Sequence, residues 1–241
     1  MRKLILVVGI ISLVFIFTST AAAIRETRRM SLTPETEERF VVDAGAGDLH
    51  IEQRDELEEV TVKAVISVEN VSDDKFKEIT EEKMELCLEK SGNSVYLDSY
   101  FTSDSGFFEY LFGETVNGSI DLKVEIPGNF NSITVEDGSG DIILDMIEGE
   151  VEIDDGSGDI ETSNSSGNWE VEDGSGDIRF NNHSGKLSIN DGSGDIRIFN
   201  CNGDFEVNDG SGDIVIDNQH GRLKVNDGSG DIQIRNLSDS V

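Results

Sequence analysis

Twelve aspartates at fixed spacing are the residues of this sequence with the clearest potential chemistry. The hexapeptide Asp-Gly-Ser-Gly-Asp-Ile occurs six times, and each copy begins 18 residues after the previous one. If the copies stack at the spacing of neighbouring strands, about 4.8 Å, the aspartates form two columns of like charges. Ca²⁺ prefers oxygen ligands and would relieve a repulsion of about 1 kcal/mol per neighbouring pair. The first column contains Asp137, Asp155, Asp173, Asp191, Asp209 and Asp227, and the second contains Asp141, Asp159, Asp177, Asp195, Asp213 and Asp231.

The same aspartates also have a structural use that needs no metal. An aspartate before Gly-Ser-Gly can accept hydrogen bonds from the following backbone amides in an Asx-turn. The calcium-binding nonapeptide Gly-Gly-x-Gly-x-Asp-x-apolar-x would also fill 18 residues in two copies. In this register, however, its aspartate would fall at Ile142 and the equivalent isoleucines, one position after Asp141. We therefore expect turn caps and no cofactor, with a calcium-stabilised β-roll as the alternative.

A second candidate site is the segment 100–118, where aromatic residues are dense among Ser, Asp and Gly. Exposed aromatic side chains in a long loop could bind a surface protein or a glycan. The alternative is that they cover the N-terminal end of the core, because terminal repeats need capping. The residues that we predict for partner binding are Phe107, Phe108, Tyr110 and Phe112.

No arrangement of residues in the sequence is typical of an enzyme. A nucleophilic serine requires a base and an orienting acid, whereas Gly-Ser-Gly repeated six times is typical of turns. The three histidines, His50, His183 and His220, have no paired spacing, and no Cys/His zinc motif is present. Cys87 and Cys201 are too far apart along a stack of coils to pair, so we expect free thiols. We predict no catalytic residues, and a carbohydrate-active β-helix enzyme is the least favoured alternative.

The repeat unit itself predicts the elements that position these residues. Each unit has two pairs of apolar residues that alternate with polar ones, as in Ile196 and Ile198 and then Phe205 and Val207, separated by Gly-rich turns. Alternation of this kind indicates two short strands per unit. From Ile133 to Ile234 every inward position except Thr162 is apolar, and a flat sheet would leave that face uncovered. The sequence therefore predicts an all-β fold, a parallel β-solenoid (β-helix or β-roll) with 18-residue coils and stacked Asn residues at one turn.

The beginning of the chain is irregular, and we divide the sequence into three parts. Residues 1–23 contain two basic residues, an apolar run and three alanines, a pattern typical of a secretory signal peptide. We therefore predict an exported protein of the cell envelope or exterior. An uncleaved N-terminal anchor is the alternative. Residues 24–130 should form an N-terminal cap and the first irregular coils, and residues 131–241 the regular repeat. Within the cap we expect a polar lead-in over 24–39, a degenerate repeat over 40–51, strands over 60–68 and 120–126, and a helix from Ser72 to about Lys83.

Charge restricts the classes of partner. The net charge of the full chain is −31, and removal of the predicted signal peptide, which carries Arg2 and Lys3 and no acid, would make it −33. Such a protein repels nucleic acid, so we expect no nucleic-acid partner. The last coil has no predicted cap after it, and we expect self-association through this open coil.

Three segments together resemble the bacterial "putative adhesin" β-strand-repeat family, a domain of unknown function. They are the repeated Asp-Gly-Ser-Gly-Asp-Ile, the earlier Val-Asp-Ala-Gly-Ala-Gly-Asp-Leu over 42–49, and Val-Glu-Ile-Pro-Gly-Asn-Phe over 124–130. The resemblance covers roughly residues 40–236. It implies a parallel β-solenoid in an exported or envelope-associated protein, and it brings no catalytic residues with it. The function that we expect is a non-catalytic, adhesin-like binding module.

Overall fold

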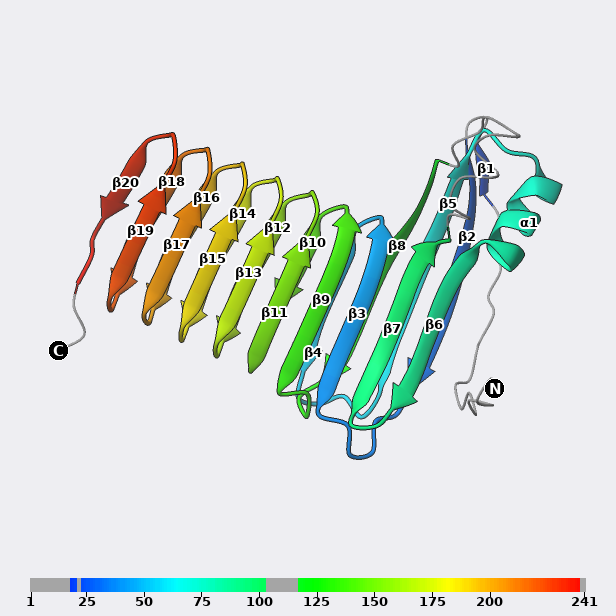
Figure 1. The fold of residues 1–241 in the computed structure, drawn as a ribbon. Helices are drawn as coiled ribbons and strands as arrows, with labels where there is room; N and C mark the ends of the chain where they lie inside the picture. The colour runs from blue at the N-terminus through cyan, green and yellow to red at the C-terminus, as the bar shows by residue number, and fades with distance from the viewer. Residues whose placement is uncertain (1–17, 21–22, 103–116, 239–241) are drawn as a thin grey trace.

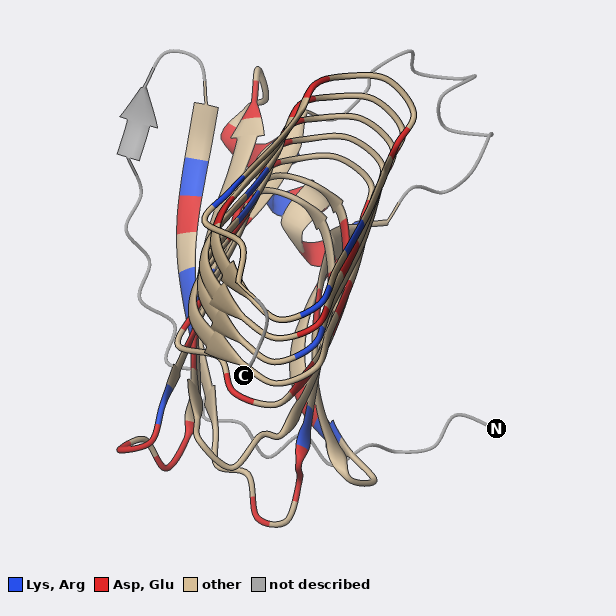
Figure 2. Cartoon of the chain, turned by 90° about the vertical axis from the view of Figure 1, so that its left-hand side faces the viewer, with Lys and Arg blue, Asp and Glu red and all other residues tan. Residues whose placement is uncertain are grey.

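The chain folds into two long β-sheets that face each other along the whole molecule (Figure 1). The computed structural model describes residues 18–20, 23–102 and 117–238. One sheet has eleven strands and the other has nine. Seen along the stack, successive coils superpose as flattened rings (Figure 2), and apolar side chains from both sheets form one core between them. Among the described residues, no helix has the length and apolar character that a membrane span requires.

The C-terminal half, which we call the array (residues 132–238), is built from parallel strands in strict register. Each residue pairs with the residue 18 positions later, as Ile142 does with Ile160 and Val151 with Trp169. This register confirms the predicted solenoid and its 18-residue coil. The array strands of the nine-stranded sheet are β9 (Ser132–Ser139), β11 (Glu150–Asp155), β13 (Trp169–Asp173), β15 (Leu187–Asp191), β17 (Phe205–Asp209) and β19 (Leu223–Asp227). Those of the eleven-stranded sheet are β10 (Ile142–Asp145), β12 (Ile160–Ser166), β14 (Ile178–Ser184), β16 (Ile196–Asn202), β18 (Ile214–His220) and β20 (Ile232–Arg235).

The predicted degenerate repeat forms a complete coil, but its position in the stack is not its position in the sequence. Strands β3 (Arg39–Ala46) and β4 (Leu49–Arg54) pair in parallel with β9 and β10 on one side. On the other side they pair in parallel with β7 (Ser94–Phe101) and β8 (Gly118–Pro127). The coil formed first along the chain therefore lies between two coils formed later.

The rest of the N-terminal region (residues 23–127) adds antiparallel strands and one helix. β2 (Ala23–Leu32) pairs antiparallel with β5 (Val60–Glu69), β5 with β8, and β6 (Met84–Ser91) with β7, while the short β1 (Thr18–Thr20) flanks β2. The predicted polar lead-in over 24–39 is wrong, because residues 23–32 form a full strand. The predicted helix is confirmed as α1 (Asp73–Glu82), and the Ser72 side chain caps it by accepting the Lys75 amide hydrogen bond.

The core follows the alternation read from the sequence. Every predicted inward position from Ile133 to Ile216 is buried, including the single polar one, Thr162. In the last coil, by contrast, Ile232 and Ile234 are 47% and 41% exposed. Burial of each aliphatic or aromatic side chain is worth about 1.5–3 kcal/mol, so the hydrophobic effect dominates the stability of the array.

The turns of the array need residues that tolerate positive φ. The predicted Asn column occupies one of them with φ between 50° and 59°, a conformation that Asn adopts more readily than most residues. Two steps of the column carry the predicted side-chain ladder: Asn182 Nδ2 donates to Asn164 Oδ1 at 3.1 Å, and Asn218 Nδ2 donates to Asn200 Oδ1 at 2.9 Å. The side-chain amides of Asn164, Asn200 and Asn236 instead donate to the previous coil at the residue just before the equivalent position, which is Asp145, Asn181 or Asp217.

Candidate functional sites

The first aspartate of each repeat, in what we call the inner column, caps its own turn. Asp155 Oδ1 accepts a hydrogen bond from the Ser157 amide at 3.1 Å, and Asp173 Oδ1 accepts one from the Ser175 amide at 2.9 Å. Asp191, Asp209 and Asp227 repeat this contact with the serine two residues later. The predicted Asx-turn is thus present at five of the six copies. It follows from the short side chain of Asp, which reaches the amide two residues on.

The inner column from Asp137 to Asp209 is also buried, which is unusual for carboxylates, whereas Asp227 in the last coil is only partly buried. Asp155 is 2% exposed and Asp137 is 6% exposed, and the second carboxyl oxygens of Asp155, Asp173, Asp191 and Asp209 have no hydrogen-bond partner. Burial, reinforced by the Asp155 charge, raises the pKa of Asp137 to about 7. Burial also raises the pKa values of Asp155, Asp173 and Asp191 to about 6. These groups therefore take up protons well above the pH at which an ordinary aspartate does.

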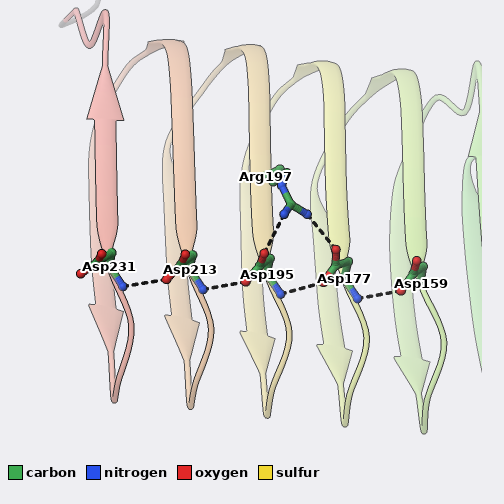
Figure 3. A network of polar contacts seen from close by, with 6 residues as sticks. All are labelled: Asp159, Asp177, Asp195, Arg197, Asp213 and Asp231. Carbon is green, nitrogen blue, oxygen red and sulfur yellow. Dashed lines mark hydrogen bonds and ion pairs between the residues drawn. The ribbon is translucent and has the colours of Figure 1, made fainter.

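The second aspartate of each repeat belongs to a different structure, which we call the outer column (Figure 3). In the first five members, from Asp141 to Asp213, Oδ1 accepts a hydrogen bond from the backbone amide of the equivalent aspartate in the next coil. The amide of Asp177 reaches Asp159 at 2.9 Å, and the amide of Asp195 reaches Asp177 at 2.9 Å. Arg197 bridges two members by pairing with Asp177 and Asp195 at 2.7 and 2.6 Å. The outer column thus ties coil to coil, whereas the inner column closes turns within a coil.

The two columns end at different places. In the coil of β3 and β4, Ala44 is the partner of Asp137, so the inner column stops there. The outer column continues, because the Asp141 amide donates to Asp48 Oδ1 at 3.3 Å and the Asp48 amide donates to Asp121 Oδ1 at 3.4 Å. Asp48 belongs to the predicted degenerate repeat over 40–51, whereas Asp121 was not predicted to join the column. The signal was present, since Asp-Leu-Lys-Val over 121–124 has the Asp-apolar-x-apolar pattern of the repeats.

The predicted calcium site has no ready-made cluster in the described part of the chain. Within residues 18–20, 23–102 and 117–238, no three His, Cys, Asp or Glu side chains are grouped so that they could hold a metal ion. The inner carboxyls face their own turns and the outer carboxyls face the amides of the next coil. Calcium binding by the two columns stays a prediction, and melting experiments can test it.

One histidine lies deep in the array beside a serine and a cysteine. His183 is 1% exposed, and its Nδ1 lies 2.9 Å from Ser165 Oγ. Burial lowers the pKa of His183 to about 4. The rings of Trp169 and Phe180 lie edge-on to the imidazole, and the His183 amide donates to Cys201 Sγ at 3.4 Å. This buried serine–histidine pair is shielded from any substrate, so it stabilises the core and offers no nucleophile.

The two cysteines are free, as predicted. Cys201 is buried and Cys87 is partly buried on β6, and burial raises the pKa of both thiols. The predicted aromatic binding residues, Phe107, Phe108, Tyr110 and Phe112, lie outside the described residues. Their role stays a prediction.

A groove of about 600 Å³ crosses the outer face of the nine-stranded sheet. It extends over β3, β9, β11, β13 and β15, and most of its lining is polar. At one outward position four residue types occur in six coils, with Glu in three of them, while the adjacent inward position is always a β-branched aliphatic residue. The outward side chains are Thr134, Glu152, Glu170, Ser188, Glu206 and Lys224, and the inward ones are Val135, Ile153, Val171, Ile189, Val207 and Val225.

Comparison with known families accounts for both the repeat and the two-sheet stack. The sequence profile of the family described as Toastrack DUF4097 matches residues 37–240. The chain belongs to the Toastrack DUF4097 family. The match includes the coil of β3 and β4 and the whole array, so the resemblance inferred from the repeated hexapeptide is confirmed for the fold. A comparison with curated proteins gave no match.

Several solved structures are similar to this Toastrack chain. A "putative cell adhesion protein" from Clostridium sporogenes is 15% identical, with 90% of this chain and 100% of that chain covered and a TM-score of 0.44. A "putative adhesin" from Bacteroides fragilis is 8% identical over 89% of this chain and 97% of that one, with a TM-score of 0.46. A "putative lipid binding protein" from Parabacteroides distasonis is 14% identical over 90% and 97%, with a TM-score of 0.41.

Proposed function

We propose that this Toastrack chain is an exported, non-catalytic binding module that recognises a surface protein or a glycan through the outer faces of its sheets. The observation that carries the proposal is the contrast between inward and outward positions. The inward residues and the turns repeat, which makes a rigid scaffold. The outward residues are not the same in every coil, and a stack of repeats with a varied outer face is a common basis for an extended binding surface.

The groove on the nine-stranded sheet is the main surface that we assign to this role. Its polar lining includes Arg39 and Lys186 together with Glu152, Glu170 and Ser188. Hydroxyl, carboxylate and basic groups side by side can both donate to and accept from the hydroxyls of a glycan or the polar groups of a protein. The strands below hold the backbone of these residues in fixed positions, so less conformational entropy is lost on binding than with a flexible loop.

Binding can be tested with the full chain on a printed panel of bacterial polysaccharides and extracellular-matrix proteins. We expect a bound subset that is released unchanged, without cleavage products. The double variant E152A/E170A in the groove should weaken that binding at least tenfold. The matched control is E81A/E82A, which removes the same charge from the exposed end of α1. Cleavage of a panel member, or equal binding by the two double variants, would contradict the proposal.

Export can be tested separately in a bacterial host. We expect the full chain to become accessible to added protease outside the cytoplasmic membrane. A variant that lacks residues 2–17 should stay protected inside intact cells. Protection of both forms would contradict export, and accessibility of both would show that residues 2–17 are not the export signal.

A further inference from the structure

A row of basic side chains crosses the outer face of the eleven-stranded sheet in the N-terminal region. Arg29 on β2 is the cross-strand partner of Lys63 on β5, and Lys63 is the partner of Lys123 on β8. Lys123 in turn lies opposite His50 on β4. Direct cross-strand partners have Cβ atoms about 4.5–5.5 Å apart on the same face of the sheet. Arg29, Lys63 and Lys123 are all exposed, so three positive charges lie in line at the surface.

This row is unexpected in so acidic a chain. The sequence has 50 acidic and only 19 basic residues, so acidic neighbours are abundant. The ion pairs of the described residues nevertheless use other cations: Arg28, Arg54, Lys75, Lys90, Arg197, Arg222 and Lys224. Like charges directly opposite each other destabilise a sheet. The folded chain alone therefore gains nothing from the row, and a bound anion would remove its cost.

The surroundings of the row leave room for such an anion. A groove of about 410 Å³ lies over β2, β5 and β8, and its lining includes Arg29, Lys63 and Lys123. Glu125 is the one acidic residue in that lining. Its carboxylate accepts the Thr61 hydroxyl hydrogen bond at 3.2 Å and lies 3.8 Å from Arg54. The acidic residue of this lining is thus held by other partners.

We propose that the row binds an acidic polysaccharide, whose negative charges lie along the row. This inference rests on the proposed function, because it names one chemical class among the glycans that a binding module could take. The charges of the row are separated by one strand spacing, about 4.8 Å. A glycan with one carboxylate or sulfate per sugar unit carries negative charges that are similarly far apart. Duplex DNA carries one charge per about 1.7 Å and would be repelled more strongly by the rest of the chain.

The other anionic partners fit the face less well. A flat anionic membrane would also meet the exposed Glu161, which lies further along the same row of the same sheet. A polymer can lie on the groove and leave the acidic array in solvent, where salt screens repulsion beyond about 8 Å at physiological ionic strength. A second copy of the chain is also acidic. Its charged side chains lie on a folded surface, however, so that whole surface would have to fit against the row.

The experiment measures binding of the full chain to two polyanions and to one uncharged polymer. We expect polygalacturonate and dextran sulfate to bind at 50 mM NaCl, and uncharged dextran not to bind. Binding should weaken at least tenfold at 200 mM NaCl, because polyanion binding by several cations is strongly salt-dependent. Lys63→Gln and Lys123→Gln should each weaken binding at least fivefold. Lys224→Gln on β19 removes the same charge from the other sheet and should leave binding unchanged.

A structural role for the row predicts a different result. If Lys63 and Lys123 only supported the fold, their variants would melt at a lower temperature, whereas we expect an unchanged or slightly higher melting temperature. Failure of both polyanions to bind, or an equal loss with Lys224→Gln, would overturn the proposal. Tighter binding to phosphatidylglycerol vesicles than to either polyanion, or self-association that Lys63→Gln abolishes, would overturn it in favour of a membrane or a second copy. Polyanion binding that E152A/E170A abolishes and Lys63→Gln leaves intact would overturn this inference alone, whereas a panel without any binding would contradict the proposed function.

Discussion

The array and the N-terminal region share the same two sheets but satisfy their polar groups in different ways. In the array, the polar residues of the Asp-Gly-Ser-Gly-Asp turn repeat every 18 residues, so one contact is copied along the stack, as in the outer column of aspartates. In the N-terminal region, each contact is individual. Glu26 and Arg28 form a pair at 2.7 Å on β2, and Gln53 donates to the Phe130 carbonyl at 2.9 Å.

The difference shows what repetition can and cannot do. A repeated contact makes the coils equivalent, so a further coil can be added with the same residues and the same contacts. Any unfavourable feature of the coil is then repeated as well. The buried inner column is such a feature, and it stops at Ala44, where the irregular coils begin. The N-terminal region avoids that column and instead carries the unpaired basic row. Four experiments test this difference between the two regions, beginning with the one that should change stability most.

The largest effect should come from glycines that lie over another backbone. Gly176 has φ of 147°, and an added Cβ would clash with the Gly158 carbonyl oxygen of the previous coil. We expect Gly176→Ala to destabilise the protein by more than about 3 kcal/mol, since a backbone clash adds to the strain of the conformation. Chemical denaturation with urea measures this free energy.

The matching glycine in the N-terminal region gives the control. Gly92 in the β6–β7 turn also has positive φ, 65°, but nothing lies within 4 Å of an added Cβ. Gly92→Ala should therefore cost only about 1–2 kcal/mol, the penalty of the left-handed conformation. Equal costs at the two sites would show that close stacking of the coils is not what requires glycine in the array.

The second effect is a dependence of stability on pH that comes from the inner column. The folded-state pKa of Asp137 is about 7 and that of Asp173 is about 6, above the ordinary value of 3.8. Between these values the folded state binds more protons than the unfolded state, so stability falls as pH rises from about 4 to 7. His183 acts in the opposite direction, because its pKa of about 4 makes stability fall as pH drops below about 6.5. Since several carboxyls oppose one imidazole, we expect a higher melting temperature at pH 5 than at pH 7.5.

Substitution can assign this dependence to the inner column. Asp173→Asn keeps an oxygen to accept the Ser175 amide and cannot ionise. At about 1.4 kcal/mol per pKa unit, it should stabilise the protein by up to about 3 kcal/mol at pH 7.5, by roughly half as much at pH 5, and by little below about pH 3.5, where the aspartate is protonated in both states. Asp159→Asn in the exposed outer column is the control, and its effect should be small at both pH values. A pH dependence that Asp173→Asn leaves unchanged would contradict this assignment.

The sequence determines the array far more completely than the N-terminal region. Alternation and period alone predict both strands of every coil, the Asx-turns and the buried positions from Ile133 to Ile216. They do not predict that β3 and β4 lie between later coils, because the pairing partner of a strand is not a local property. They also miss β2, where Glu26 and Arg28 replace apolar residues on the inner face. The basic row was not predicted either, because its members lie on strands that are distant in the sequence and only strand pairing brings them together.

A smaller effect should follow from loss of one outer-column contact. Asp159 Oδ1 accepts the Asp177 amide at 2.9 Å. Asp159→Ala leaves that amide without its partner, but solvent can reach it, so we expect a loss of about 0.5–1.5 kcal/mol in urea denaturation. Asp159→Asn keeps the acceptor and should be nearly neutral. A loss as large with Asn as with Ala would show that the charge, and not the hydrogen bond, matters in this column.

The smallest effect should be that of calcium, and it separates the two uses of the aspartates. Turn caps and coil-to-coil hydrogen bonds already engage one oxygen of most members of the two columns. Millimolar Ca²⁺ should then raise the melting temperature no more than Mg²⁺ does, because both ions only screen a net charge of −31. A large rise with Ca²⁺ that EDTA reverses and Mg²⁺ does not reproduce would establish the β-roll alternative. Asp159→Asn and Asp173→Asn would then show which column supplies the ligands, since only the ligating column should lose the calcium response.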